Sequence, residues 1–533
     1  MSTDRRGADL AVAALAAAGV RHVFTLSGNH VLALYDATIG RDLSLIHTRH
    51  EAAAVHMADA WGRLTGEPGV ALMTAGPGHA NALSALWGAL MAESPLVLLS
   101  GHPPRDEIGH GSFQEMDQVA AARPMTKAAW LVERPERIAD DVREALAVAR
   151  SGRPGPVHLS LPGDVLESRV DVPDRSAPAV SPDVGTFDAA AAHELVARLQ
   201  AAERPLILAG PAMGRGVRAA AMNAFARASG IPALPIESPR GVNDPWLRGA
   251  TKCFGEADLV LLLGKALDFS LKFGAAPFPT SCRFVQIAAD APAPLKTSRV
   301  ERAWTADPVA ALDALGEAAR SVSWRSSTWR ATVERARTAM PDAWDAIRRA
   351  PGSPMHPLGV AAALEPWIAA GAVLVSDGGE FGQWMQAGLE PRERLINSLG
   401  GSIGSAIPMA VAAKLARPER TVFATVGDGT FGFHPFELDT ALRAGLPIVC
   451  VVGNDARWNA EHQLQLRQYG AARTVGCELL PTRHDAVAEA LGGFGTHVDD
   501  PADLPRALER AVASGRPAVI DVTIASLAAP TWR

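Results

Sequence analysis

The sequence predicts an α/β protein of three doubly wound domains with mainly parallel sheets, and three observations lead to this fold class. Short apolar runs alternate with Ala-rich stretches of helical composition. Two proline-rich stretches, residues 170–185 and 348–357, interrupt this alternation. The 533 residues also exceed what one ordinary hydrophobic core accommodates. We therefore expect domains at residues 1–168, 186–340 and 355–533.

The apolar runs are the expected strands. The first segment carries them from residues 22, 70, 96 and 157, the second from residues 205, 257 and 282, and the third from residues 372, 421 and 448. The Ala-rich stretches between them are the expected crossover helices, which join parallel strands of one sheet.

The N-terminal residues allow one alternative. Arg5-Arg6 followed by the apolar residues 10–20 imitates a twin-arginine export signal. Asp9 interrupts the segment upstream, and the run leads into Arg21 and the first expected strand without a clear cleavage site. We interpret the run as the first helix of the fold.

Composition excludes several classes of function. Hydrophobic residues make up 48% of the chain, charged residues 20%, and the net charge is −6, which is typical of a soluble globular protein without a nucleic-acid partner. No apolar stretch reaches the roughly 18 residues that span a membrane. The cysteines show neither CxxC spacing nor clustered histidines, so we expect neither zinc nor disulfides, and a cytoplasmic location. They are Cys253, Cys282, Cys450 and Cys477.

Two carboxylates follow two expected strands of the third segment. The run at 421–426 meets Gly427-Asp428-Gly429, and the run at 448–453 meets Asn454-Asp455. Ligands bind at the carboxyl ends of neighbouring parallel strands, so both carboxylates are expected at one site. Two hard oxygen ligands suit Mg²⁺, and glycines at a helix N-terminus suit a diphosphate. An isolated GDG is more often an ordinary turn, but the second carboxylate favours a metal site.

The GDG motif followed, after residues 430–453, by Asn-Asp resembles the cofactor motif of thiamin diphosphate (ThDP) enzymes. Its form is similar to that of acetolactate synthase, benzaldehyde lyase and the 2-hydroxyacyl-CoA lyases. The resemblance implies that the side chains of Asp428 and Asp455 and the backbone carbonyl of Arg457 bind Mg²⁺. Many relatives carry Asn in place of Asp455, and the added negative charge beside a diphosphate requires more compensation from the metal and from helix N-termini.

The resemblance extends to the layout of the chain and to other residues near the diphosphate. The three segments match the family's pyrimidine-binding, central and diphosphate-binding domains. Ile403 occupies the position from which a bulky apolar residue holds the cofactor in its bent shape, a role compatible with an ordinary core residue. Trp458 follows the metal loop and is expected in one wall of the substrate pocket. The cofactor-binding residues implied on this side are Gly379, Glu380, Gly401, Ile403, Gly427, Asp428, Gly429, Thr430, Asp455 and Trp458.

Three residues of the first segment are implied in catalysis. Glu51 stands where an extended run turns into a helix, and it resembles the family's activating glutamate, which binds the cofactor's pyrimidine; alone it would be a Glu favoured by the helix dipole. His30 aligns with a histidine of benzaldehyde lyase-like sites and suits moving a hydroxyl proton, with a purely structural histidine as an equal alternative. Gln114 would donate to a developing alkoxide. The loop at 74–81, with its Gly-Pro-Gly turn, resembles the family loop beside the cofactor.

The middle segment argues against other cofactors. The turn at 209–217 lacks the GxGxxG fingerprint of a dinucleotide site, which argues against an NAD oxidoreductase. The run at 264–274 differs from the corresponding run of FAD-containing acetolactate synthases and resembles that of 2-hydroxyacyl-CoA lyases, so FAD is not expected. Leu464 stands where acetolactate synthases place a Trp, which weakens that specific assignment.

These features predict an acetolactate synthase-like enzyme, dependent on ThDP and Mg²⁺. It would be a lyase, carboligase or decarboxylase acting on small 2-oxo acids or 2-hydroxy carbonyl compounds. One alternative is a 2-hydroxyacyl-CoA lyase, which would take a CoA thioester. Another is a catalytically silent regulatory paralogue, against which the intact Glu51, Asp428 and Asp455 argue. The resemblance implies a homodimer or homotetramer with active sites between subunits.

Overall fold

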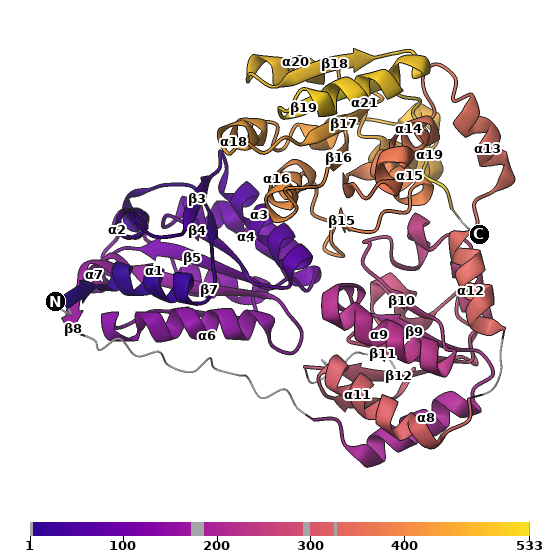
Figure 1. Cartoon of the computed structure of the whole chain (residues 1–533), viewed down its shortest axis with the longest axis horizontal. Coiled ribbons are helices and arrows are strands. Elements are labelled where there is room, and N and C mark those ends of the chain that lie inside the picture. The colour runs from indigo at the N-terminus through magenta and orange to yellow at the C-terminus, as the bar shows by residue number, and fades with distance from the viewer. Residues whose placement is uncertain (1–3, 172–185, 291–298, 325–327, 532–533) are drawn as a thin grey trace. The chain divides into compact units, whose positions relative to one another are not determined.

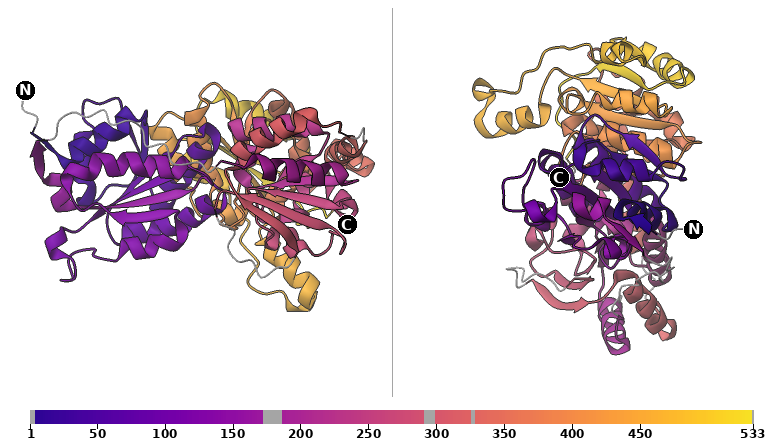
Figure 2. Two further views of the ribbon diagram at one scale, coloured as in Figure 1. Left: turned by 90° about the horizontal axis from the view of Figure 1, so that it is seen from below. Right: turned by 90° about the vertical axis from the view of Figure 1, so that its left-hand side faces the viewer.

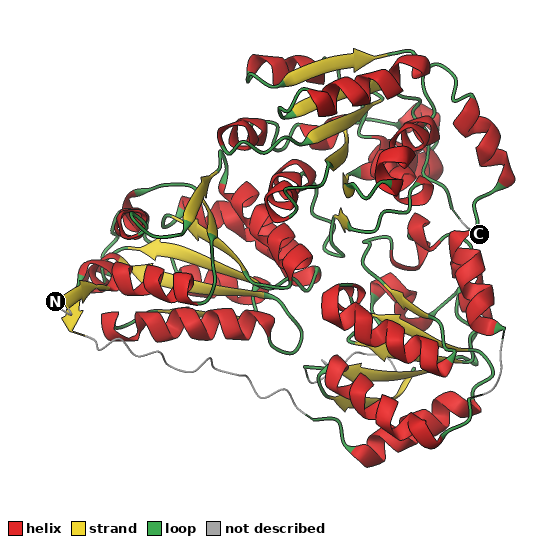
Figure 3. Cartoon of the chain, viewed as in Figure 1, coloured by secondary structure: helices red, strands yellow, loops and turns green. Residues whose placement is uncertain are grey.

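A computed structural model describes residues 4–171, 186–290, 299–324 and 328–531, and it contains three parallel sheets (Figure 1). Helices cover the sheets, and loops connect the two kinds of element in alternation (Figure 3). The expected fold class is therefore confirmed. Most of the proline-rich stretch at 170–185 lies outside the described residues, whereas residues 350–356 of the second stretch are an irregular connection between two helices.

The N-terminal sheet has six parallel strands in the order β3-β2-β4-β5-β7-β6. The strands are β2 (His22–Thr25), β3 (Ser44–His47), β4 (Gly69–Met73), β5 (Leu96–His102), β6 (Ala128–Leu131) and β7 (Pro156–Pro162). Two short strands, β1 (Asp4–Arg6) and β8 (Arg169–Asp171), pair antiparallel outside this sheet. No apolar run in the sequence indicates this last pair.

Helices cover both faces of the N-terminal sheet. On one face lie α1 (Gly7–Ala17) and α6 (Ile138–Arg150), and on the other lie α3 (Glu51–Thr65) and α4 (Pro77–Met91) (Figure 1). The remaining short helices are α2 (Leu32–Ala37), α5 (Gln118–Ala122) and α7 (Gly163–Glu167). The apolar run near the N-terminus forms α1, as expected, and buries Leu10 and Leu15 against the sheet.

The spacing of apolar residues explains why α6 packs as it does. Ile138, Val142, Ala145 and Ala149 recur at helical spacing and are buried in the same core as α1. Two acidic residues occupy its first turn and Arg150 its last, which suits the helix dipole.

Two helices of the third segment belong to the same compact unit as the N-terminal sheet. These are α16 (Ala406–Ala416), from residue 407 onward, and α18 (Glu437–Arg443). Glu437 Oε1 accepts a hydrogen bond from the Arg49 backbone N–H at 3.0 Å, and the Arg443 guanidinium donates to the His47 carbonyl at 2.6 Å. The structural unit therefore includes residues that are distant in sequence.

The central sheet has five parallel strands in the order β10-β9-β11-β12-β13. Its strands are among the pink arrows in the left view of Figure 2. The strands are β9 (Pro205–Ala209), β10 (Ala233–Pro235), β11 (Leu259–Leu263), β12 (Arg283–Ala288) and β13 (Val300–Thr305). One hydrophobic core lies under α8 (Ala189–Ala201), α9 (Gly216–Ser229) and α11 (Pro308–Ala318), and a second lies under α10 (Ala250–Cys253) and α12 (Trp329–Thr338).

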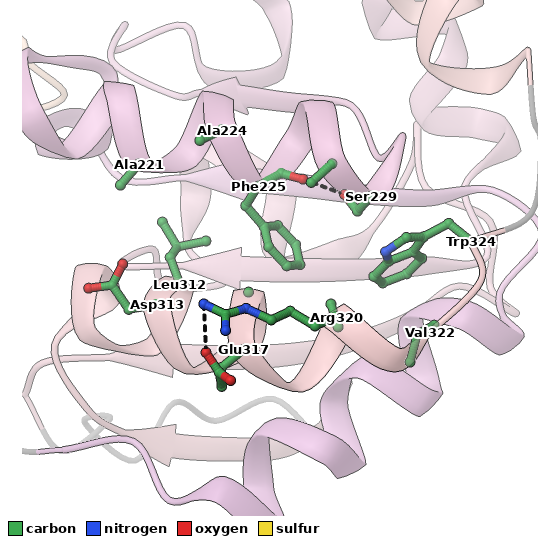
Figure 4. Close-up of a pocket in the computed structure, with 13 residues that line it drawn as sticks. Ala221, Ala224, Phe225, Ser229, Leu312, Asp313, Glu317, Arg320, Val322 and Trp324 are labelled. Carbon is green, nitrogen blue, oxygen red and sulfur yellow. Dashed lines mark hydrogen bonds and ion pairs between the residues drawn. The ribbon is translucent and has the colours of Figure 1, made fainter.

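A cavity of about 680 Å³ lies between α9 and α11 (Figure 4). Phe225, Leu312 and Trp324 form its apolar walls, and an ion pair of Arg320 with Glu317 at 3.0 Å stands at its side. Small residues of the two helices leave the space open. The residues that line it include none of those expected to bind the cofactor.

The C-terminal sheet has six parallel strands in the order β15-β14-β16-β17-β19-β18. The strands are β14 (Val373–Asp377), β15 (Arg394–Ile396), β16 (Val422–Gly427), β17 (Val449–Asn454), β18 (Phe494–Val498) and β19 (Ala518–Thr523). Its other helices are α13 (Asp342–Arg349), α14 (Pro357–Ala369), α15 (Gly379–Gly388), α17 (Asp428–Phe431), α19 (Asn459–Tyr469), α20 (His484–Ala490) and α21 (Leu504–Ala513).

The N-terminal and C-terminal sheets share one topology. When the strands of each sheet are numbered in chain order, their spatial order is 2-1-3-4-6-5 in both sheets. The chain therefore reverses direction across the sheet between β2 and β4, and again between β14 and β16. A crevice forms at the carboxyl ends of such a pair of strands, which is where ligands bind in doubly wound sheets. In the described part of the chain, no helix is both long enough and apolar enough to cross a membrane.

Candidate active site

The crevice of the C-terminal sheet is a small pocket at the carboxyl ends of β14, β16 and β17. It encloses about 70 Å³. The glycine-rich junctions that follow these three strands meet there, as the strand order requires. Gly401, in contrast, does not line the pocket and is exposed on the loop that carries Ile403. The expected residues that line it are Gly379, Glu380, Ile403, Gly427, Asp428, Gly429, Thr430, Asp455, Arg457 and Trp458.

Asp428 and Asp455 both face this pocket. Asp428 is 5% exposed, and it accepts hydrogen bonds from the backbone N–H groups of Gly429 at 2.8 Å and Arg457 at 3.1 Å. Burial raises the pKa of Asp428. Burial, and then the charge of Asp428, raises the pKa of Asp455 to about 7. A buried and a half-buried carboxylate, of which the first opposes the ionisation of the second, form a donor set that fits a hard divalent cation.

Glycine is required where the backbone forms the walls of the pocket. A Cβ on Gly429 would lie 2.7 Å from ring carbons of Trp458, and one on Gly378 would lie 2.5 Å from Thr430 Oγ1. Gly378 also has a φ of 78°, which disfavours other residues. Helix α15 begins at Gly379 and α19 at Asn459, so the N-termini of both helices border the pocket. Close backbone approach and helix N-termini suit a diphosphate.

The loop that carries Asp455 is held in place by Asn454. Its Oδ1 accepts from the Ala456 N–H at 3.2 Å, and its Nδ2 donates to the Thr482 carbonyl at 2.9 Å and to Asp521 Oδ1 at 3.1 Å. Ala456 has a φ of 53°, a left-handed conformation that these contacts stabilise. Asn454 therefore fixes the backbone from which Asp455 and Arg457 project.

The N-terminal sheet carries Glu51 at the first position of α3. His50 caps this helix, because its side chain accepts from the Ala52 N–H at 3.1 Å. Glu51 Oε2 accepts a hydrogen bond from Asn81 Nδ2 at 3.0 Å. Asn81 lies on α4, three residues after the Gly-Pro-Gly turn, whose Gly76 has a φ of 55°. The turn thus places a donor opposite the carboxylate.

The crevice of the N-terminal sheet, at the ends of β2 and β4, contains His30, Thr74 and Gln114. His30 lies in a short 3₁₀ helix, Asn29–Val31, that follows β2, and Thr74 follows β4. His30 Nδ1 is 3.3 Å from Thr74 Oγ1, and Thr74 Oγ1 donates to Gln114 Oε1 at 3.5 Å. Since the Thr74 proton goes to Gln114, Nδ1 of His30 is the donor to Thr74. The lone pair of a neutral His30 is then on Nε2.

Burial and the nearby His102 lower the pKa of His30. The imidazole is therefore neutral near pH 7, as a proton acceptor must be. Phe113 stacks on the His30 ring with centroids 6.1 Å apart, and Phe113 itself is 68% exposed. Gln114 has a φ of 61°, and its carbonyl would be 2.6 Å from a Cβ at Gly76, so that glycine permits the arrangement.

The geometry defines a class of enzyme, and comparison with known proteins identifies it. The crevice of the C-terminal sheet presents two carboxylates and glycine-rich helix N-termini, and the N-terminal sheet presents a carboxylate at a helix start. Three family descriptions match the chain: "Thiamine pyrophosphate enzyme, N-terminal TPP binding domain" over residues 5–121, the central domain over residues 192–315, and the C-terminal TPP binding domain over residues 377–522. The chain belongs to the thiamine pyrophosphate enzyme family.

Similar proteins of known name fall into the two groups that the sequence indicates. The chain is 36% identical to a probable acetolactate synthase of Mycobacterium bovis, over 95% of this chain and 94% of that protein. It is 30% identical to 2-hydroxyacyl-CoA lyase 2 of Homo sapiens, over 92% of this chain and 85% of that protein. The corresponding Bos taurus protein is 29% identical, with 98% and 90% covered. This confirms the expected family, and the chain is a thiamin diphosphate-dependent enzyme.

Several residues of the two sites were not predicted as such. Thr74 and Asn81 lie within the loop at 74–81, where a polar residue on each side of the Gly-Pro-Gly turn was an available signal. Asn454 immediately precedes a predicted ligand.

Proposed function

We propose that this enzyme uses Mg²⁺ with ThDP to break or form a carbon–carbon bond next to a carbonyl group. The substrates are small 2-oxo acids or 2-hydroxy carbonyl compounds, as for an acetolactate synthase-like enzyme. When bound, ThDP supplies a carbon nucleophile that adds to carbonyl groups. The hydrogen-bonded chain of His30, Thr74 and Gln114 carries this proposal, because it presents one proton acceptor and one donor at the end of a strand pair.

In the proposed reaction, His30 Nε2 accepts the proton of a substrate hydroxyl. Thr74 holds the ring through Nδ1 and so fixes both its orientation and its tautomer. Gln114 uses its Oε1 to accept from Thr74, which leaves its amide N–H groups for the substrate oxygen. A neutral amide stabilises an oxygen that gains negative charge without losing a proton to it.

Glu51 would hold the pyrimidine of the cofactor, and Asn81 would orient its carboxylate. The 3.0 Å hydrogen bond from Asn81 occupies Oε2 and leaves Oε1 for a ligand. On the diphosphate side, the side chains of Asp428 and Asp455 and the carbonyl of Arg457 would hold Mg²⁺. The remaining cofactor contacts would come from the residues that line the pocket, with Ile403 supporting the bent shape.

We also propose that the enzyme is a homodimer or homotetramer, with each active site shared between two copies. Helix α19 begins beside the metal pocket, and none of its described residues is buried; its Leu464 and Tyr469 are 47% and 61% exposed. Apolar side chains in this setting are typical of an interface. Composition supports a cytoplasmic location, and neither a membrane nor a nucleic acid is a proposed partner.

Mixing two inactive variants tests the shared site. Glu51→Gln removes the pyrimidine carboxylate and Asp428→Ala removes the metal carboxylate. In a mixed dimer with shared sites, one site carries both changes and the other carries neither, so random mixing restores about a quarter of wild-type activity. If every site lies within one copy, mixing restores none.

The second candidate is a 2-hydroxyacyl-CoA lyase, which the similarity to the Homo sapiens and Bos taurus lyases favours together with Leu464. A product assay with ThDP and Mg²⁺ separates the candidates, using pyruvate, benzoylformate, benzoin and a 2-hydroxyacyl-CoA. Release of CO₂ indicates decarboxylation, and aldehyde without CO₂ indicates a lyase. Turnover that needs none of ThDP, Mg²⁺ or Glu51 would contradict both candidates. FAD has no role in either, so the purified protein should be colourless.

A further inference from the structure

Ile403, which is proposed to support the bent shape of the cofactor, lies in a loop between β15 and α16. It is half-buried and lines the pocket of the C-terminal sheet. An apolar side chain can fix the shape of a ligand only when its own backbone is held in place. The three residues that follow Ile403 are held by two buried side chains from other parts of the sheet.

The first of these side chains is Asp377, the last residue of β14. Its Oδ2 accepts hydrogen bonds from the Ser405 N–H at 2.5 Å, the Ala406 N–H at 3.3 Å and the Ser405 hydroxyl at 3.3 Å. Ala406 begins α16, and the first N–H groups of a helix have no partner within the helix. Asp377 therefore supplies the acceptor that this helix start needs, and it does so from a neighbouring strand.

The second side chain is His434, which follows α17. Its Nδ1 donates to the Gly404 carbonyl at 2.7 Å. Gly404 has a φ of 88°, and a Cβ there would collide with Phe433, so only glycine lets the two segments approach this closely. The residue directly after Ile403 is thus fixed by the segment that follows the helix of Asp428.

Both contacts lead to walls of the same pocket. Gly378 and Gly379 follow Asp377 directly and line the pocket, and residues 428–430 of α17 line it as well. The loop is therefore tied to the glycine-rich junctions after β14 and β16. These ties fix Ile403 relative to the part of the pocket that is proposed to bind the diphosphate.

We infer that Asp377 and His434 are positioning residues for Ile403. Asp377 holds the start of α16 and His434 holds Gly404, so that Ile403 keeps its place in the pocket. The inference rests on the proposed ThDP site. It assigns a function to two buried side chains that the proposed reaction does not use.

The rate at which deuterium replaces the C2 proton of bound ThDP measures the expected effect. This proton leaves readily only when the cofactor is bent, because the bend places its pyrimidine against C2. Asp377→Ala should slow the exchange roughly 10²-fold, the cost that a displacement of about 1 Å can have. The ThDP affinity measured by calorimetry should change much less, because the residues that face the diphosphate are kept. Asp377→Asn keeps an acceptor at the same place and should exchange as the wild type does.

Asp307→Ala is the matched control. Asp307 is also buried at a helix start, where it accepts from the N–H groups of Val309 at 2.9 Å and Ala310 at 3.1 Å, but its helix α11 covers the central sheet. Its loss should lower the unfolding temperature, as the loss of Asp377 does, without slowing the exchange. Because Asp377 acts through Ile403, Asp377→Ala should slow the exchange no further in a protein that already carries Ile403→Ala.

His434→Leu tests the second contact, because leucine cannot donate to the Gly404 carbonyl. His434→Asn places an amide N–H where Nδ1 of the histidine stood. We expect slower exchange in the first variant and the wild-type rate in the second. This pair also carries the test if Asp377→Ala does not fold.

An exchange rate equal to that of the wild type in Asp377→Ala or His434→Leu would overturn the inference for that residue. Equal slowing in Asp377→Asn or Asp307→Ala would overturn it as well, and so would a further loss of rate when Asp377→Ala is added to Ile403→Ala. If the wild type binds no ThDP, or binds it without accelerating the exchange over that of free ThDP, the proposed function itself fails. The two failures are therefore distinguishable.

Discussion

Replacing Asp455 by Asn should stabilise the metal-free protein, and more so at higher pH. In the folded protein, burial and the neighbouring Asp428 raise the pKa of Asp455 to about 7, whereas the unfolded chain has the ordinary value of 3.8. The folded state therefore binds this proton more tightly. The stability that the folded state gains from this tighter proton binding is complete below pH 3.8, and it is lost as the pH rises through about 7.

The expected size follows from this pKa difference. Between pH 5 and pH 8, ionisation of Asp455 should cost the folded state roughly 2–3 kcal/mol. The amide that replaces the carboxyl group in the variant does not titrate. The stability of Asp455→Asn relative to wild type should therefore rise by this amount over the same range. For a domain of roughly 150–250 residues, this free-energy difference corresponds to a difference in unfolding temperature of roughly 5–10 °C.

Thermal unfolding of both proteins at pH 5 and pH 8, without metal or ThDP, measures this difference. The exposed Asp503 provides a control, because Asp503→Asn removes a carboxylate that faces solvent. Adding Mg²⁺ and ThDP should abolish most of the advantage, since the metal compensates the charge. The variant should still bind both, as an amide oxygen is also a metal ligand, whereas Asp455→Ala should lose much of both. A difference that does not depend on pH would refute the reasoning.

Three further predictions concern the two halves of the site. Glu51→Gln should abolish ThDP-dependent turnover while leaving the unfolding temperature of the metal-free protein unchanged; equal turnover would remove Glu51 from the mechanism. His30→Asn should lower kcat about 10²–10⁴-fold, and it should remove the fall in activity on the acid side, whose midpoint lies below pH 6.5 because the pKa of His30 is lowered. If the activity of the variant still falls at acid pH, a group other than His30 causes that fall. Gly429→Ala should weaken ThDP binding, since its Cβ would lie 2.7 Å from Trp458, and an unchanged affinity would show that the loop adapts.

The sequence predicted the fold well because its signals were local. The strands of parallel sheets are buried on both faces, so they stand out as apolar runs, as in β11 with Leu259 to Leu263. Each expected apolar run coincides with a strand of the structure. Most of the missed strands are short or edge strands such as β1, β6 and β15. The missed β19 lies inside the C-terminal sheet, and Asp521 interrupts its apolar run. The tertiary placement of α16 and α18 depends on contacts with distant residues, and periodicity carries no information about these.

Sequence motifs identified many of the individual residues of the site, and the structure showed which of them are hydrogen-bonded to one another. The glycine-rich junctions and the carboxylates at 428 and 455 were visible because each follows a strand directly. The hydrogen-bonded order of His30, Thr74 and Gln114 was not, since a long segment separates each pair and only the sheet brings them together.

The most direct measurement for the central claim is ThDP binding to the metal-free protein by calorimetry, with and without Mg²⁺, in wild type and in Asp428→Ala. The two-carboxylate pocket predicts tight binding only when Mg²⁺ is present, and loss of that dependence in the variant. ThDP binding that is equal with and without Mg²⁺, or that Asp428→Ala leaves unchanged, would contradict the account.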